Sequence, residues 1–294
     1  MDYFLTQLAN GICQGAIYAL MAIGYSTIVG VVGLATFAYG EVMMIGAFAA
    51  YYSFLYLGDN IIIGLIASFL GSAIIGYLIH KICYENFFDK PKQISLICTI
   101  GFSTLLKNLA QLVFGAATKA VPNVINNFFI DIGPVRINAV QIAVLITVIV
   151  FSFLLYILFN KTKLGIKLRA VSQNREAAAL MGIDVKKTAL LGNMIGCGLG
   201  GIAGLLLALY YLSLYPTMGS TFGNKAFVSS IIGGLSSIPL SAAGGIIIGL
   251  IENIATAFLP NSYKDVFAYI FLFIVLMISP TGLAKKRGNR PWLK

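Results

Sequence analysis

The sequence has little charge. Only 10% of its 294 residues are Asp, Glu, Lys or Arg, whereas about a quarter of the residues in an average soluble domain are charged. Apolar residues make up 59% of the chain, and its mean hydropathy is +0.91. These values exclude an ordinary soluble domain and indicate an integral membrane protein.

Side chains that perform chemistry are also scarce. The single histidine, His80, stands at the edge of an apolar segment and forms no hydrolytic set with the serines and the few acidic residues. The four cysteines are scattered and match neither a metal motif nor a disulfide framework. The pattern GxxxxGK followed by Ser or Thr is missing, so the chain does not bind ATP through a P-loop. We therefore predict a protein that is not an enzyme and that needs no cofactor and no metal.

Acidic residues are outnumbered two to one, 10 against 20 basic residues, which gives a net charge of +10. Such a surplus can indicate binding to nucleic acid. In this chain the basic residues lie between apolar segments, and no soluble domain remains that could hold a nucleic acid. We therefore exclude nucleic acid as a partner.

Long apolar runs fill the chain, and many reach the roughly 20 residues that a helix needs to cross the hydrocarbon core of a membrane. The runs are continuous rather than alternating, which excludes a transmembrane β-barrel. We predict an all-α polytopic transmembrane bundle of about eight or nine segments, including short broken helices, that forms a single domain over residues 1–294 in contact with lipid. The predicted segments are 7–30, 40–57, 61–80, 94–114, 138–159, 188–213, 226–239, 243–259 and 265–283.

The seventh and eighth predicted segments are short and meet in a Gly-, Pro- and Ser-rich stretch, 233–245. Such an interruption at membrane depth is tolerated only inside protein or beside a polar cavity, and broken helices often mark a transport path. Charges in apolar segments are costly. For Glu252, the deepest by sequence, a structural hydrogen bond is favoured over contact with a substrate. The residues expected along a translocation path are Glu41, Gly233, Gly234, Pro239 and Glu252.

Basic residues also predict the orientation of the chain. The stretches 80–93, 160–187 and 284–294 hold three, seven and five of the 20 lysines and arginines, so we expect all three to be cytoplasmic. An even number of spans must separate the last two stretches, which favours two crossings within 226–259. The parity of the spans then places the N-terminus outside.

The polar break from residue 160 to residue 187 contains the pattern of a short helix. Asn174 can serve as N-cap, Glu176 suits the positive first turn, and Gly182 can adopt the left-handed conformation that ends a helix. The alanines between them allow close approach. The pattern predicts a small helix on the inner face that another protein grips; the alternative is a solvated basic connector.

Four glycines recur at every fourth position, which places them on one face of the sixth predicted segment. This small-xxx-small spacing lets helices approach closely in lipid. The residues predicted to form this helix-packing face are Gly192, Gly196, Gly200 and Gly204.

Several segments together resemble the permease subunits of branched-chain amino acid ABC importers, and more closely the shorter of the two paired permeases. They are TKLGIKLRAVSQNREAAALMGI at 162–183, NGICQGAIYALMAIG at 10–24, GSTFGNKAF at 219–227, the glycines and proline at 233, 234 and 239, GLIE at 249–252, and PTGL at 280–283. The resemblance covers nearly the whole chain in order. Thr36 and Tyr39 depart from the family pattern, which has Asn and His at these positions.

The resemblance implies a multi-pass protein of a bacterial or archaeal plasma (inner) membrane that forms a channel with a homologous permease. Two cytoplasmic ABC ATPases would drive transport, and an external substrate-binding protein would deliver the amino acid. The helix from Asn174 to Met181 would be a coupling helix, with Ala178 packed in a groove of the ATPase. The residues implied in this coupling are Gly165, Arg169, Ala170, Asn174, Ala177, Ala178 and Gly182.

Other functions remain open at this point. Related permeases carry urea, amides or sugars, so the solute could be a small polar molecule instead. An autonomous secondary carrier or channel is a second alternative, although the scarcity of acidic residues in the apolar segments favours transport driven from outside the chain. A lipid-modifying membrane enzyme would need a catalytic set that the sequence does not contain.

Overall fold

A computed structural model describes residues 2–87, 91–122, 124–125, 129–132, 135–235, 237–258, 260, 264–279 and 282. The basic stretch 284–294 lies outside the described residues. The α-helices are α1 (Asp2–Val32), α2 (Tyr39–Leu57), α3 (Ile61–Ile79), α4 (Lys92–Phe114), α5 (Ala139–Lys161), α6 (Lys163–Gln173), α7 (Arg175–Leu180), α8 (Val185–Tyr211), α9 (Met218–Gly233), α10 (Ile238–Phe258) and α11 (Lys264–Ile278). A π-helical turn, His80–Tyr84, and a 3-10 turn, Glu85–Phe87, extend α3.

Seven helical segments of the described chain are long and apolar enough to cross a membrane. The shorter helices α9 and α11 correspond to two more of the predicted segments, so the prediction of an all-α polytopic bundle is confirmed. Two boundaries are corrected. The seventh segment begins at Met218, eight residues before its predicted start, and the eighth is not short, because α10 spans 21 residues from Ile238. Most of the stretch 233–245 is therefore helical.

Local signals set several helix ends. Asn138 caps α5 through a capping box with Gln141, and the side chain of Asn60 accepts the backbone N–H of Ile62 at the start of α3. Helix α2 ends before Gly58, and α4 before Gly115, both with positive φ.

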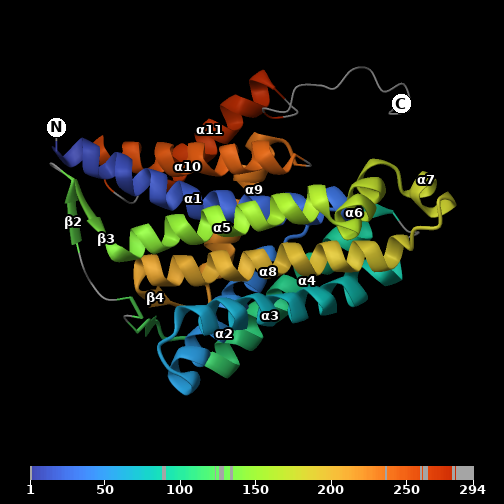
Figure 1. Cartoon of the computed structure of the whole chain (residues 1–294), viewed down its shortest axis with the longest axis horizontal. Helices are drawn as coiled ribbons and strands as arrows, with labels where there is room; N and C mark the ends of the chain where they lie inside the picture. The colour runs from blue at the N-terminus through green and yellow to red at the C-terminus, as the bar shows by residue number, and fades with distance from the viewer. Residues whose placement is uncertain are drawn as a thin grey trace.

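The two ends of the bundle differ, as Figure 1 shows. One end carries the N-terminus and short antiparallel pairs: β1 (Lys119–Ala120) with β4 (Ser213–Leu214), and β2 (Phe129–Ile132) with β3 (Val135–Asn138). Helices α6 and α7 lie at the opposite end. This arrangement agrees with the parity of the spans, which places the N-terminus on the side opposite the loop 160–187.

Helices α1 and α8 form the centre of the bundle, and most of their side chains are buried. Helices α4 and α5 instead expose large apolar side chains such as Leu112 and Ile149. In a membrane such faces suit lipid or another membrane protein.

The glycine row of α8 faces α1 and α2. A Cβ atom at Gly196 would lie 2.7 Å from the carbonyl oxygen of Gly24 in α1. One at Gly204 would lie 2.3 Å from the carbonyl oxygen of Met43 in α2. Near Gly192 and Gly200 the neighbours are side chains, at 3.0 Å and 2.9 Å. The absence of side chains at this row allows three helices to meet nearly backbone to backbone.

Candidate functional site

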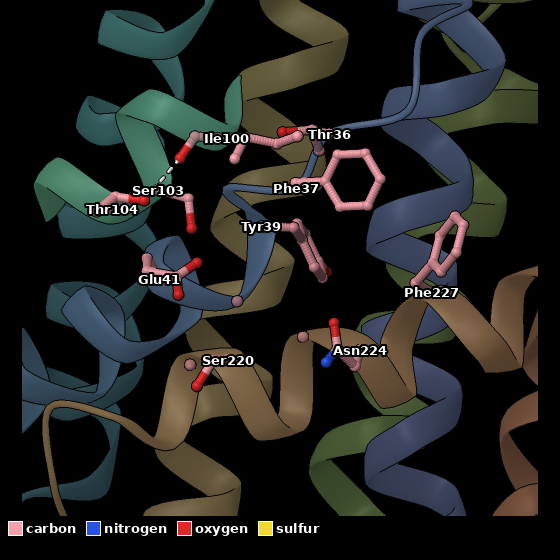
Figure 2. Close-up of a pocket in the computed structure, with 13 residues that line it drawn as sticks. Thr36, Phe37, Tyr39, Glu41, Ile100, Ser103, Thr104, Ser220, Asn224 and Phe227 are labelled. Carbon is pink, nitrogen blue, oxygen red and sulfur yellow. Dashed lines mark hydrogen bonds between the residues drawn. The ribbon is translucent and has the colours of Figure 1, made fainter. Parts of the chain in front are cut away.

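The larger of two described cavities has a volume of about 310 Å³ and lies between the α1–α2 connection, α4 and α9. Figure 2 shows Glu41, Ser103 and Thr104 on one side of the cavity and the rings of Phe37, Tyr39 and Phe227 toward the other, with the polar Ser220 and Asn224 on α9. The cavity is lined by Thr36, Phe37, Tyr39, Gly40, Glu41, Ile100, Ser103, Thr104, Gly219, Ser220, Gly223, Asn224 and Phe227. Its wall is thus amphipathic, with an acidic group and hydroxyls facing aromatic rings.

A break in the helices creates this cavity. Helix α1 ends at Val32, Gly33 adopts a left-handed φ of +65°, and α2 begins only at Tyr39. The start of α2 then contacts α9 directly, since a Cβ at Gly40 would lie 2.0 Å from the carbonyl oxygen of Gly219. Close glycine contact therefore anchors the two helices at one edge of the cavity.

Aromatic contacts fix the apolar wall. The ring of Tyr25 lies 5.4 Å from that of Tyr39 and 5.7 Å from that of Phe227, and the Phe37 ring lies 6.0 Å from Phe227. The Tyr39 hydroxyl donates to the carbonyl of Met21 at 2.9 Å. Tyr39 is therefore held in place, whereas 46% of Phe37 is exposed.

Glu41, one of the predicted path residues, lines this cavity and is only 3% exposed. Thr36 and Tyr39, the two departures from the expected family pattern, also line it.

Glu252, the other acidic residue predicted on the path, lies elsewhere, in a buried polar network. Its Oε1 is 3.0 Å from Nζ of Lys225, and that amine is also 2.7 Å from Oδ1 of Asp265. The Tyr18 hydroxyl donates to Glu252 Oε2 at 2.9 Å, and Nζ of Lys264 lies 3.7 Å from the same oxygen. The network joins α1, α9, α10 and α11.

Amides extend the network. Asn253 donates to the side-chain carbonyl of Gln14 at 2.8 Å, and Gln14 donates to the Tyr211 hydroxyl at 2.8 Å. Lys225 and Lys264 also line a second cavity of about 210 Å³, on the other side of α9 from the first. The sequence analysis did not predict Gln14 and Tyr18 as members of a polar network. The signal that could have identified them is two polar side chains four residues apart on an otherwise apolar helix.

Gly233, Gly234 and Pro239 line neither described cavity, and their place on a translocation path stays a prediction. They form the tight connection from α9 to α10. Gly234 has φ +92°, and a Cβ at Gly233 would lie 2.2 Å from the carbonyl oxygen of Leu240. Gly233 and Gly234 thus allow the backbone to pack closely and to turn here.

The polar loop contains the short helix that the sequence predicts. The side chain of Asn174 accepts the backbone N–H of Ala177 at 3.1 Å, and Gly182 adopts φ +78° after the helix. Helix α6 precedes it and was not predicted. The side chain of Thr162 caps α6 by accepting the N–H of Gly165 at 3.0 Å. A Cβ at Gly165 would lie 2.2 Å from the carbonyl oxygen of Leu158, so Gly165 allows α6 to fold against the end of α5.

The expected position of Ala178 in a groove of the ATPase is wrong. Ala178 is only 4% exposed and packs inside this chain, so it cannot sit in a groove of a partner. Leu180 and Met181 are 89% and 83% exposed instead. Among the other residues implied in coupling, Ala177 and Arg169 are exposed and Ala170 is partly buried.

A bundle of membrane-length helices with an amphipathic cavity at a helix break is the arrangement expected of a multi-pass membrane transport protein. The family described as "Branched-chain amino acid transport system / permease component" matches residues 7–276, and this chain belongs to that family. The family is one of transport components rather than of enzymes.

Curated relatives match over nearly their whole length. The high-affinity branched-chain amino acid transport system permease protein LivH of Salmonella typhimurium is 33% identical, over 96% of this chain and 95% of the relative. BraD of Pseudomonas aeruginosa, with the same description, is 32% identical over 96% and 95%. The probable branched-chain amino acid transport permease protein LivH of Methanocaldococcus jannaschii is 27% identical over 94% and 91%. No solved structure matches the chain.

Proposed function

We propose that this chain carries branched-chain amino acids across the membrane as one permease subunit of an ATP-driven importer. The observation that carries the proposal is the family match over residues 7–276, together with relatives of the same length that are described as branched-chain amino acid permeases. The proposed path runs through the cavity at the α1–α2 break.

The chemistry of this cavity suits the proposed substrate. A branched-chain amino acid combines an apolar side chain with an ammonium and a carboxylate group. The rings of Phe37 and Phe227 can contact the apolar part, and Glu41 can pair with the ammonium group. Hydroxyl and amide groups of Ser220 and Asn224 remain for the carboxylate.

The proposed assembly pairs this chain with a homologous permease, two cytoplasmic ATPases and an external binding protein. The chain itself has no P-loop pattern, so in this assembly the ATP would be hydrolysed by other subunits. The loop 160–187 would be the cytoplasmic coupling loop, and the exposed tip of α7, Leu180 and Met181, is the apolar surface on it that suits a protein partner.

Replacing Met181 with aspartate is expected to release the ATPase subunits, because burying an unpaired carboxylate at an interface costs several kcal/mol. The measurement is the amount of ATPase that copurifies with the permease pair. The variant should keep the wild-type unfolding temperature, since Met181 makes little contact within this chain.

The matched control is Ala178→Asp, which buries a charge inside this chain and should lower the unfolding temperature itself. If the Met181→Asp variant copurifies with as much ATPase as the wild type, α7 is not the docking helix. The loop would then be a solvated connector.

A further inference from the structure

Helix α7 is connected directly to the end of α1. The guanidinium of Arg175, the first residue of α7, donates to the backbone carbonyl of Val32, and its Nη2 lies 3.5 Å from the carbonyl oxygen of Val31. The last carbonyl groups of a helix have no partners within the helix and carry partial negative charge. They are therefore a suitable acceptor for a guanidinium.

Gly33 leaves the space that this contact needs. A Cβ at Gly33 would lie 2.7 Å from Nη2 of Arg175. Burial lowers the pKa of the Arg175 guanidinium, but an arginine side chain stays protonated in proteins. The contact is thus a charged hydrogen bond in a partly dry setting, which is stronger than one between neutral groups.

The segment held by Arg175 continues into the wall of the cavity. Gly33 opens the non-helical connection between α1 and α2, and Thr36 and Phe37 at its far end line the cavity. The backbone N–H of Phe37 also donates to the Thr99 hydroxyl of α4 at 3.4 Å. Only three residues separate the carbonyl of Val32 from Thr36.

The other end of α7, at Leu180 and the following residue Met181, is exposed, whereas Ala178 within the helix is buried. The carbonyl of Ala178 accepts the N–H of Ile183 at 3.1 Å, which ties the helix to its exit. The exposed end is therefore joined to Arg175 by a short, hydrogen-bonded helix, which is a suitable element to transmit a displacement.

We propose that Arg175 is the positioning residue through which α7 sets the conformation of the connection 33–38, and with it one wall of the cavity. The proposal rests on the proposed function, in which α7 receives the motion of an ATPase. In this proposal, the residue that transmits the motion of α7 is Arg175, whose side chain contacts the membrane domain. The residues of α7 that contact the ATPase only receive the motion.

The test compares Arg175→Gln and Arg175→Lys with Lys167→Gln in the full complex in vesicles. Lys167 is the matched control, because it is an exposed basic residue of the same loop and is not among the residues implied in coupling. Arg175→Gln should keep the bound ATPase subunits and the basal ATP hydrolysis, but lose about tenfold in leucine transported per ATP, within the range of typical coupling energies. Arg175→Lys should restore part of the ratio, and Lys167→Gln should match the wild type.

A purely structural role for Arg175 would lower the unfolding temperature and leave the transport per ATP unchanged, which would overturn the proposal. Loss of the ATPase subunits from Arg175→Gln would also overturn it, since the side chain would then serve docking.

A spin label at residue 37 tests the link without transport. The label should gain mobility in Arg175→Gln and not in Lys167→Gln; equal mobility in both would overturn the proposal. If the wild-type complex shows no ATP-dependent uptake, the proposed function fails, while the label still reports whether Arg175 holds the connection.

Discussion

Replacing Lys225 with methionine is expected to lower the free energy of unfolding by about 3 to 5 kcal/mol, the usual cost of removing one partner of a buried ion pair. The side chain of Glu252 is fully buried, and Lys225 Nζ lies 3.0 Å from it. Lys264 remains at 3.7 Å, too far to replace the lost contact fully. The measurement is the unfolding midpoint of the purified chain in detergent.

Adding Glu252→Gln to this variant should restore part of the lost stability, because the neutral amide no longer leaves a charge buried without its cation.

Lys187→Met is the matched control. Its ion pair with Asp184 has a similar length, 3.2 Å, but both side chains are largely exposed. A backbone hydrogen bond from Lys187 is the main cause that lowers the pKa of Asp184, and this variant keeps it. The control should therefore unfold like the wild type.

A double variant as unstable as Lys225→Met would contradict this explanation. It would mean that Lys225 stabilises the bundle through the packing of its stem and not through its charge.

Replacing Gly204 with leucine is expected to separate α8 from α2 and to cost about 3 kcal/mol or more, at the upper end of the usual range for overpacking a core. Its Cβ alone would lie 2.3 Å from the carbonyl oxygen of Met43, and backbone cannot move aside as a side chain can. The measurement is the fraction of monodisperse chain after purification, together with its unfolding midpoint.

Gly101→Leu is the control, because Gly101 lies on an exposed surface of α4, where a Cβ atom would meet no neighbouring element within 4 Å. It should change the unfolding midpoint little. Equal behaviour of the two leucine variants would show that the glycine row does not hold α8 against its neighbours.

The lengths of the apolar runs in the sequence predicted most of the fold. Each predicted segment has a helix, because a run of about 20 apolar residues is a strong and local signal. The start of α9 was missed because Gly219 to Gly223 resembles a loop by composition. This part of the helix packs closely against Gly40, which is 179 residues away along the chain and gives no local signal in the sequence.

The functional features were predicted less completely for similar reasons. The caps Asn174 and Gly182 are local and were found correctly. The three alanines of α7 gave no sign of which one is buried, since that depends on the packing of the loop against α8. The partners of Glu252 come from helices on both sides of it in sequence, and Tyr18 lies 234 residues away. Only the folded chain brings them together.

The most direct test of the central claim is leucine uptake into vesicles that contain this chain, its homologous permease and the ATPases, with the binding protein outside. We predict concentrative uptake that requires ATP on the ATPase side, that excess isoleucine or valine abolishes, and that excess urea leaves unchanged. Concentrative uptake by this chain without any ATPase would contradict the claim and would indicate an autonomous carrier. Competition by urea alone would contradict the proposed substrate.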